Sequence, residues 1–205
     1  VDVALSADGT YAFITQSAAN SIVGLDISEL KNIGFPFAQP GELLETISTD
    51  KGKPTDIAVG ASLGSAVATD KENPTITIID LFHSKSSTLN LEGIPAQVAI
   101  ASDNKTAFVA VPSADGMTGK LVEVNLKKKK GTIIREIPWE GTLPIDLEIT
   151  PDGQFALMLH EGGQVSCIQL GNEVPPFSTW NTVEELGKEA VAIQIDSACN
   201  LDEYR

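Results

Sequence analysis

Three aspartates recur at matching places in the sequence, and their residue type and spacing could form a ligand-binding site. Asp2, Asp56 and Asp146 each open a short stretch in which apolar residues alternate with others, mostly small ones. Carboxylate oxygens are the ligands that hard cations such as calcium prefer, so a ring of these side chains would hold a divalent cation. The same carboxylates could instead accept backbone N–H groups and tie neighbouring parts of the chain together. We expect this second role because the residues belong to a repeat, and because Gln97 and Ala192 interrupt the ring.

A second candidate is the stretch His160-Glu161-Gly162-Gly163. A histidine and a glutamate in one loop can act as acid and base, or as metal ligands. The chain has only two histidines, and the glycine pair is also typical of a plain tight turn. His160 and Glu161 are therefore the only candidates we name for catalysis, with a structural turn as the alternative. The sequence contains no Gly-x-Ser-x-Gly, no phosphate-cradling glycine loop and no Cys-x-x-Cys-His haem motif.

The elements that must position these residues come from an internal repeat. Its copies align when the following positions are taken as equivalent: 2, 56, 97, 146 and 192. The spacings are 54, 41, 49 and 46 residues, close to the ~40–50 residues of one propeller blade. Pro54, Pro95 and Pro144 stand two positions before the equivalent residue. This position suits a loop entering a strand, because proline has no N–H to give to a sheet.

Each repeat is typical of four short β-strands separated by turn residues. In the first repeat we expect strands at 3–5, 11–15, 21–27 and 42–47, and in the third at 106–111, 120–126 and 132–137. Helical spacing of apolar residues is nearly absent. The first strand of each unit is rich in small residues, which suit a crowded position next to a central axis: Ala4, Ala58, Gly60, Ala99 and Ala101. The chain is therefore predicted to be all-β, and specifically a β-propeller.

At these residues the sequence resembles the YVTN-type β-propeller repeat family. The units of that family run from a proline through alternating hydrophobic residues to Ser-Pro-Asp-Gly and an aromatic-rich strand. The best matches are Thr150-Pro151-Asp152-Gly153 and Ser6-Ala7-Asp8-Gly9, whereas Gly60-Ala61-Ser62-Leu63-Gly64 in the second repeat lacks the Asp-Gly turn. The resemblance implies the fold but no single activity, since the family includes surface-layer proteins, cytochrome-partner subunits and lactonase-like enzymes.

The repeat also sets the expected blade boundaries. Four complete four-stranded blades are expected at about 1–50, 51–93, 94–142 and 143–189, with the first strand of a fifth at 190–205. Relatives of this type close with about seven blades, within the usual range for propellers. We therefore expect a segment of a larger propeller. Its partners would be the remaining blades of the same propeller or a second protein chain.

Composition narrows the classes of partner. Fourteen Lys and Arg against 28 Asp and Glu leave a net charge of −14, which repels phosphate backbones and anionic lipid, so we expect no nucleic-acid partner. No apolar run approaches the ~18 residues that span a bilayer, so we expect no membrane insertion. The two cysteines, Cys167 and Cys199, are too few for a disulfide framework and lack the spacing of a metal site.

These observations favour a non-catalytic binding or scaffold segment. The resemblance implies a secreted, periplasmic or cell-surface setting. The alternative is part of a propeller enzyme, either a lactonase-like hydrolase or a dehydrogenase subunit, with its site at the mouth of the axial channel. A carbohydrate-binding propeller ranks last, because Trp139 and Trp180 do not occupy equivalent positions. No cofactor is expected, apart from the calcium that the aspartates would hold.

Overall fold

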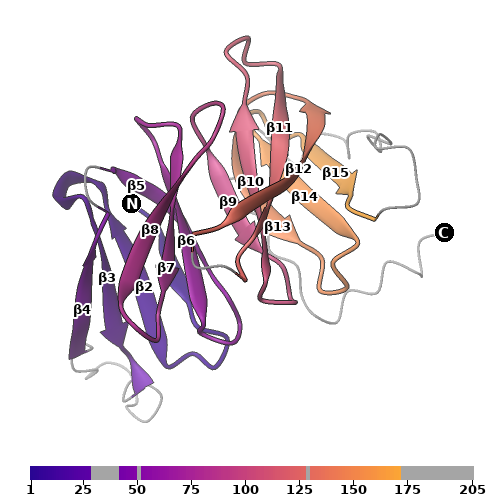
Figure 1. The fold of residues 1–205 in the computed structure, drawn as a ribbon. Helices are drawn as coiled ribbons and strands as arrows, with labels where there is room; N and C mark the ends of the chain where they lie inside the picture. The colour runs from indigo at the N-terminus through magenta and orange to yellow at the C-terminus, as the bar shows by residue number, and fades with distance from the viewer. Residues whose placement is uncertain (29–41, 50–51, 128–129, 172–205) are drawn as a thin grey trace.

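The computed structural model describes residues 1–28, 42–49, 52–127 and 130–171, which are mostly β-strands and the turns between them, with a short 3-10 helix, η1 (Ser17–Ala19). None of the helical structure in these ranges is long and apolar enough to cross a membrane. The strands form antiparallel sheets in which neighbours in the chain are neighbours in the sheet (Figure 1). The first sheet contains β1 (Val3–Leu5), β2 (Tyr11–Gln16), β3 (Ser21–Asp26) and β4 (Glu42–Ser48).

The later sheets repeat this order. The second sheet contains β5 (Pro54–Val59), β6 (Ser65–Asp70), β7 (Thr75–Asp80) and β8 (Lys85–Asn90). The third contains β9 (Gln97–Ile100), β10 (Thr106–Pro112), β11 (Thr118–Asn125) and β12 (Thr132–Glu140). In the described part of the fourth are β13 (Pro144–Ile149), β14 (Phe155–His160) and β15 (Val165–Gln169). The predicted strands of the first and third repeats agree with these bounds to within two residues, except that β12 runs on to Glu140.

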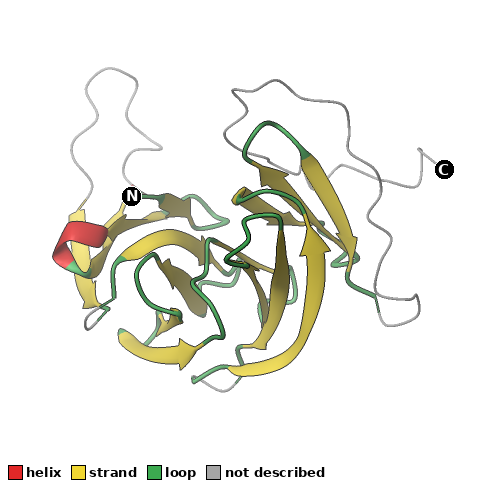
Figure 2. Ribbon diagram, turned by 90° about the horizontal axis from the view of Figure 1, so that it is seen from above, coloured by secondary structure: helices red, strands yellow, loops and turns green. Residues whose placement is uncertain are grey.

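The four sheets are the blades of a β-propeller, as predicted. The first strand of each sheet is innermost: β1 lies beside β5, β5 beside β9, and β9 beside β13. Seen from above, the sheets follow one another around a curved arc (Figure 2). We call them the first to fourth blades in chain order. The predicted last strand of the fourth blade and the start of a fifth fall in residues 172–205, outside the described residues.

The hydrophobic core lies between the blades. On β10, Phe108 and Ala110 face the fourth blade, whereas Ala107 and Val109 face the second. Successive side chains of a strand point to opposite faces, so a blade that is covered on both sides needs apolar residues at nearly every position of its central strands. This requirement explains the continuous apolar runs of the sequence. Each fully buried large side chain contributes about 1.5–3 kcal/mol.

The Asp-Gly turns of the repeat connect the first two strands of a blade. In the first blade the Ser6 hydroxyl donates to the Asp8 carboxylate at 2.6 Å, and Gly9 follows with a φ of 65°. The fourth blade repeats the contact between Thr150 and Asp152, at 2.5 Å. The carboxylate thus bonds locally and closes the turn, as short polar side chains do outside regular structure.

Candidate functional site at the axial channel

The innermost strands of all four blades line one cavity of about 510 Å³. Its walls come from the start of each repeat: residues 2–5, 56–59, 98–100 and 146–148. Positions 2, 56 and 146, taken as equivalent in the sequence, therefore lie around a common channel, whereas Gln97 is not among the lining residues and position 192 lies outside the described residues. Four of the lining side chains are carboxylic acids: Asp2, Asp56, Asp146 and Glu148.

Asp2 and Asp56 form the same hydrogen bond, each to the following blade. The Ile57 N–H of the second blade donates to Asp2 Oδ2 at 3.1 Å. The Val98 N–H of the third blade donates to Asp56 Oδ2 at 2.6 Å. Because each carboxylate accepts a backbone N–H one blade further on, it joins the innermost strands of neighbouring blades. For Asp2 and Asp56, this arrangement is the architectural role that we expected of the recurring aspartates.

Two threonines that were not predicted from the sequence support these aspartates. The backbone N–H of Asp2 donates to Thr15 Oγ1 at 2.7 Å, and that of Asp56 donates to Thr69 Oγ1 at 3.2 Å. Thr15 Oγ1 also lies 3.2 Å from the Thr55 carbonyl oxygen of the second blade. Both threonines follow their aspartate by 13 residues, so a comparison of the repeats at that spacing would have found them.

Asp146 has a different local geometry. A register shift in the pairing of β13 with β14 lies between Pro144 and Asp146, and Asp146 Oδ1 accepts the N–H of the adjacent Leu147 at 2.9 Å. Asp146 nevertheless lines the same cavity as Asp2 and Asp56. The structure therefore brings the three predicted aspartates together at the channel.

The channel disfavours negative charge. Burial, together with the nearby carboxylates of Asp2 and Asp146, raises the pKa of Asp56 well above its usual range, although the Val98 N–H opposes that rise. Burial and the charge of Asp146 raise the pKa of Glu148 to about 7. Loss of hydration and neighbouring like charges both favour the protonated acid. The site thus contains two carboxyl groups that resist ionisation, those of Asp56 and Glu148, beside the carboxyl groups of Asp2 and Asp146.

Glu148 was not predicted from the sequence. Its position in the repeat holds Ala4, Ala58 and Ala99 in the first three blades. A carboxyl group where the other copies have alanine, two residues after Asp146 on an alternating strand, marks it as a channel residue. Among the residues that the structure describes, no three or more His, Cys, Asp or Glu side chains are arranged to hold a metal ion. Calcium at the channel stays a prediction.

His160 and Glu161 lie away from the cavity. His160 ends β14 rather than lying in the expected loop, and its side chain is fully buried. Its Nδ1 lies 2.7 Å from the Thr142 carbonyl oxygen, and its Nε2 lies 2.8 Å from Ser166 Oγ. A carbonyl oxygen only accepts, so Nδ1 carries the proton and Nε2 is left to accept from the Ser166 hydroxyl.

The surroundings of His160 favour its neutral form. Its ring centroid lies 5.4 Å from that of Trp139, and burial lowers its pKa, although the Thr142 carbonyl acts the other way. Glu161 follows at an exposed turn, where its backbone N–H donates to the Leu143 carbonyl at 2.9 Å. The two residues, named together from the sequence, thus occupy different environments, and we assign His160 a structural role within the fourth blade.

Comparison with known proteins supports the fold. No family model and no curated protein matches the chain. Among solved structures, it is similar to the hydrazine synthase of Kuenenia stuttgartiensis, with a TM-score of 0.67 and 18% identity. That match covers 82% of this chain and 45% of the other. It is also similar to a functionally unknown protein from Desulfotomaculum acetoxidans, with a TM-score of 0.72 and 16% identity over 96% of this chain and 59% of that one. The chain thus spans about half the length of these structures, and at such identities the likeness concerns the fold alone.

Proposed function

We propose that the chain is a non-catalytic β-propeller segment that provides a binding or scaffold surface in a protein outside the cytoplasm. The hydrogen bonds that the Ile57 N–H donates to Asp2 and the Val98 N–H donates to Asp56 support the non-catalytic role. They engage Asp2 and Asp56, two of the three recurring channel carboxylates, because these two groups hold one blade to the next. His160 is likewise occupied by partners within its own blade and the loop leading into it.

The proposed partners are further blades of the same propeller or a second protein chain. Val3 and Leu5 of the first blade are 56% and 59% exposed, although apolar side chains at the same positions of the next blades are largely covered. Exposed apolar side chains at the innermost strand of a blade favour a protein surface as their cover. The acidic surface, with a net charge of −14, disfavours nucleic acid in that role.

Fractionation of source cells tests this proposal. An antibody raised against this chain would locate the native protein among cytoplasmic, periplasmic, surface and secreted fractions. The expected result is an extracytoplasmic protein, larger than this chain or in complex with a second protein. A cytoplasmic protein of the size of this chain, free of partners, would contradict the proposal.

A second candidate function is supported by Glu148 and Asp146. Both line the channel cavity, and the pKa of Glu148 is raised to about 7. A carboxyl group that keeps its proton near neutral pH beside a second carboxyl group can serve general acid and base chemistry. The corresponding activity is hydrolysis, as in the lactonase-like alternative, with the reaction at the channel.

A panel of lactones separates the two candidates. If the chain is a scaffold, the wild-type chain gives no more turnover than the Glu148→Gln and Asp146→Asn variants do, with or without added calcium. A hydrolase instead gives turnover that both substitutions abolish and whose pH profile has an inflection near 7. Glu161→Gln, at an exposed turn outside the cavity, is the matched control and should leave any such activity unchanged.

A further inference from the structure

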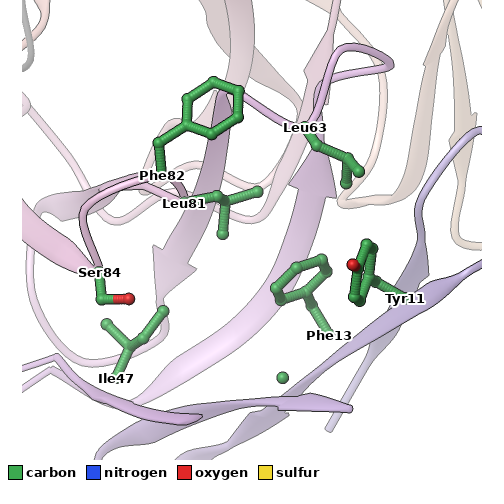
Figure 3. Close-up of a pocket in the computed structure, with 8 residues that line it drawn as sticks. Tyr11, Phe13, Ile47, Leu63, Leu81, Phe82 and Ser84 are labelled. Atoms are coloured by element: carbon green, nitrogen blue, oxygen red, sulfur yellow. The ribbon is translucent and has the colours of Figure 1, made fainter. Parts of the chain in front are cut away.

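A second cavity, of about 350 Å³, lies between the first and second blades. It is found at the ends of the blades opposite Asp2 and Asp56, near the turns that follow β5 and β7. Tyr11, Phe13 and Ile47 of the first blade face Leu81 and Phe82 of the second across it (Figure 3). Phe13 and Ile47 are buried, whereas Phe82 is 73% exposed. The pocket thus has a fixed apolar floor and an aromatic ring at its rim.

Leu63 completes the wall of this pocket at a position where leucine is unfavourable. The turn between the first two strands of each blade contains one residue with a positive φ: Gly9, Leu63, Asn104 and Gly153, at 65°, 56°, 56° and 70°. Glycine and asparagine tolerate this conformation, whereas for other residues it costs roughly 1–2 kcal/mol. Only the second blade has a large apolar residue there. Such a local departure from favourable backbone chemistry is typical of functional sites.

A second strained residue lines the same pocket. Ser84 has a φ of 52° and closes the turn between β7 and β8, next to Phe82. Among the non-glycine residues with positive φ in the described ranges, the two that are not asparagine are Leu63 and Ser84. Both residues line this one cavity, and their turns form part of its wall.

The chemistry of the lining selects the class of ligand. None of the eight lining residues is charged, although the chain as a whole carries −14. The side-chain hydrogen-bonding groups are the hydroxyls of Tyr11 and Ser84. Ligand sites are commonly ~300–1,000 Å³, mainly apolar, with a few polar groups that set orientation. This pocket is at the lower end of that range.

We propose that this pocket binds a neutral small molecule that has one or two aromatic rings and a hydrogen-bonding group. Apolar contacts with Phe13, Leu63 and Phe82 supply the affinity, and the hydroxyls of Tyr11 and Ser84 orient the ligand. The proposal goes beyond the scaffold role and does not depend on the channel.

The test uses the full chain and the fluorescent probe 2-naphthol, a two-ring compound that is neutral at pH 7, with indole as a competitor. The expected result is saturable binding of one probe per chain that indole displaces. Phe82→Ala and Leu63→Asn should each weaken binding about tenfold, since each removes apolar contact from the bound state. Leu63→Asn places at this turn the residue that the third blade carries there, so it keeps a backbone-compatible side chain.

Met117→Ala is the matched control, because Met117 is 60% exposed and lies in the turn between β10 and β11, away from this pocket. It should leave probe affinity unchanged. The urea midpoints of unfolding of all three variants should differ little from that of wild type. Non-saturable binding, or equal losses for Phe82→Ala and Met117→Ala, would overturn the proposal. Binding of an aromatic peptide without binding of either free compound would overturn it as well.

Discussion

Asp56 shows how one side chain can stabilise the fold while lying in an unfavourable electrostatic position. Its carboxylate accepts the Val98 N–H at 2.6 Å and thereby joins the second and third blades. Its burial and the neighbouring Asp2 and Asp146 raise its pKa. The geometry is thus favourable for an oxygen acceptor and unfavourable for a negative charge. An uncharged acceptor of the same shape would retain the first property and remove the second.

The first prediction separates those two properties. Asp56→Ala should lower the free energy of unfolding by about 1–3 kcal/mol, because it leaves the buried Val98 N–H without its acceptor. Asp56→Asn keeps an oxygen at that position and should cost much less. Urea unfolding of both variants measures the difference, with the exposed Glu161→Ala as control. Equal losses for the alanine and asparagine variants would mean that the hydrogen bond is not what matters.

The second prediction concerns Glu148 and pH. Its pKa is raised from 4.5 to about 7 in the folded chain, so between these values the folded state holds a proton that the unfolded state has released. The contribution of Glu148 to stability is therefore complete below about pH 4.5 and is lost as the pH rises to about 7. The difference in free energy of unfolding between wild type and Glu148→Gln should follow this course.

His160 must be separated from that measurement. Burial lowers its pKa from 6.5, so below 6.5 the unfolded state gains a proton that the folded state resists. Its contribution to stability therefore falls as the pH drops, opposite to that of Glu148. Because His160 is present in both proteins, subtracting the Glu148→Gln values from wild type cancels its effect. A difference that stays constant from pH 4.5 to 7 would contradict the raised pKa of Glu148.

At the scale of the elements, the strands and their order could be predicted from the sequence. Repeated alternation, turn residues and prolines before the innermost strands act locally, and the structure places strands of the first and third blades where they indicated. Register shifts were not predictable in the same way. The shift between Glu123 and Val124 depends on how β11 and β12 pair, which no single strand encodes.

The candidate site could be predicted only in part, for a related reason. Asp2, Asp56 and Asp146 were found because they recur, and the structure brings them to one cavity. Glu148 differs from the repeat, and a search for recurrence passes over such a residue. His160 was placed in a loop because it stands shortly before Gly162 and Gly163, but the tertiary contacts with Thr142 and Ser166 set its role.

The third prediction tests a close approach between two strands. Gly119 on β11 pairs with Trp139 on β12, and a Cβ at position 119 would overlap the indole and lie 2.8 Å from the Val111 carbonyl oxygen. Gly119→Ala should therefore cost about 1–3 kcal/mol, as overpacking in a well-packed core does. Gly64→Ala is the control, because its Cβ would meet its nearest atom at an ordinary 3.5 Å. Urea midpoints measure both, and equal shifts would contradict the close packing of Trp139.

At the scale of the whole molecule, contacts between neighbouring blades stabilise the fold. Separate hydrophobic clusters fill the three junctions between neighbouring blades, and carboxylate hydrogen bonds reinforce the first two junctions at the channel. In such an arrangement each blade depends on the cover that its neighbours provide. The innermost strand of the first blade differs from the others, because its apolar side chains remain exposed.

That exposure leads to the fourth prediction. Val3 and Leu5 are 56% and 59% exposed, so two such side chains on one strand favour association with another apolar surface. The double substitution of Val3→Thr and Leu5→Thr keeps residues that favour strands but reduces this apolar surface. Sedimentation velocity over a range of concentrations should show less self-association than in wild type. The free energy of unfolding should change by less than about 0.5 kcal/mol, as for most surface substitutions.

Met117→Thr provides the control for this last experiment, because it removes an equally exposed apolar side chain from a turn instead of from a strand. It should leave self-association unchanged. In a longer protein whose next blade covers β1, Val3→Thr and Leu5→Thr should leave self-association unchanged. They should instead lower the free energy of unfolding, since the two side chains would then be buried. Wild-type chains that show no self-association, together with a longer protein that tolerates both threonines, would show that no protein surface covers this strand.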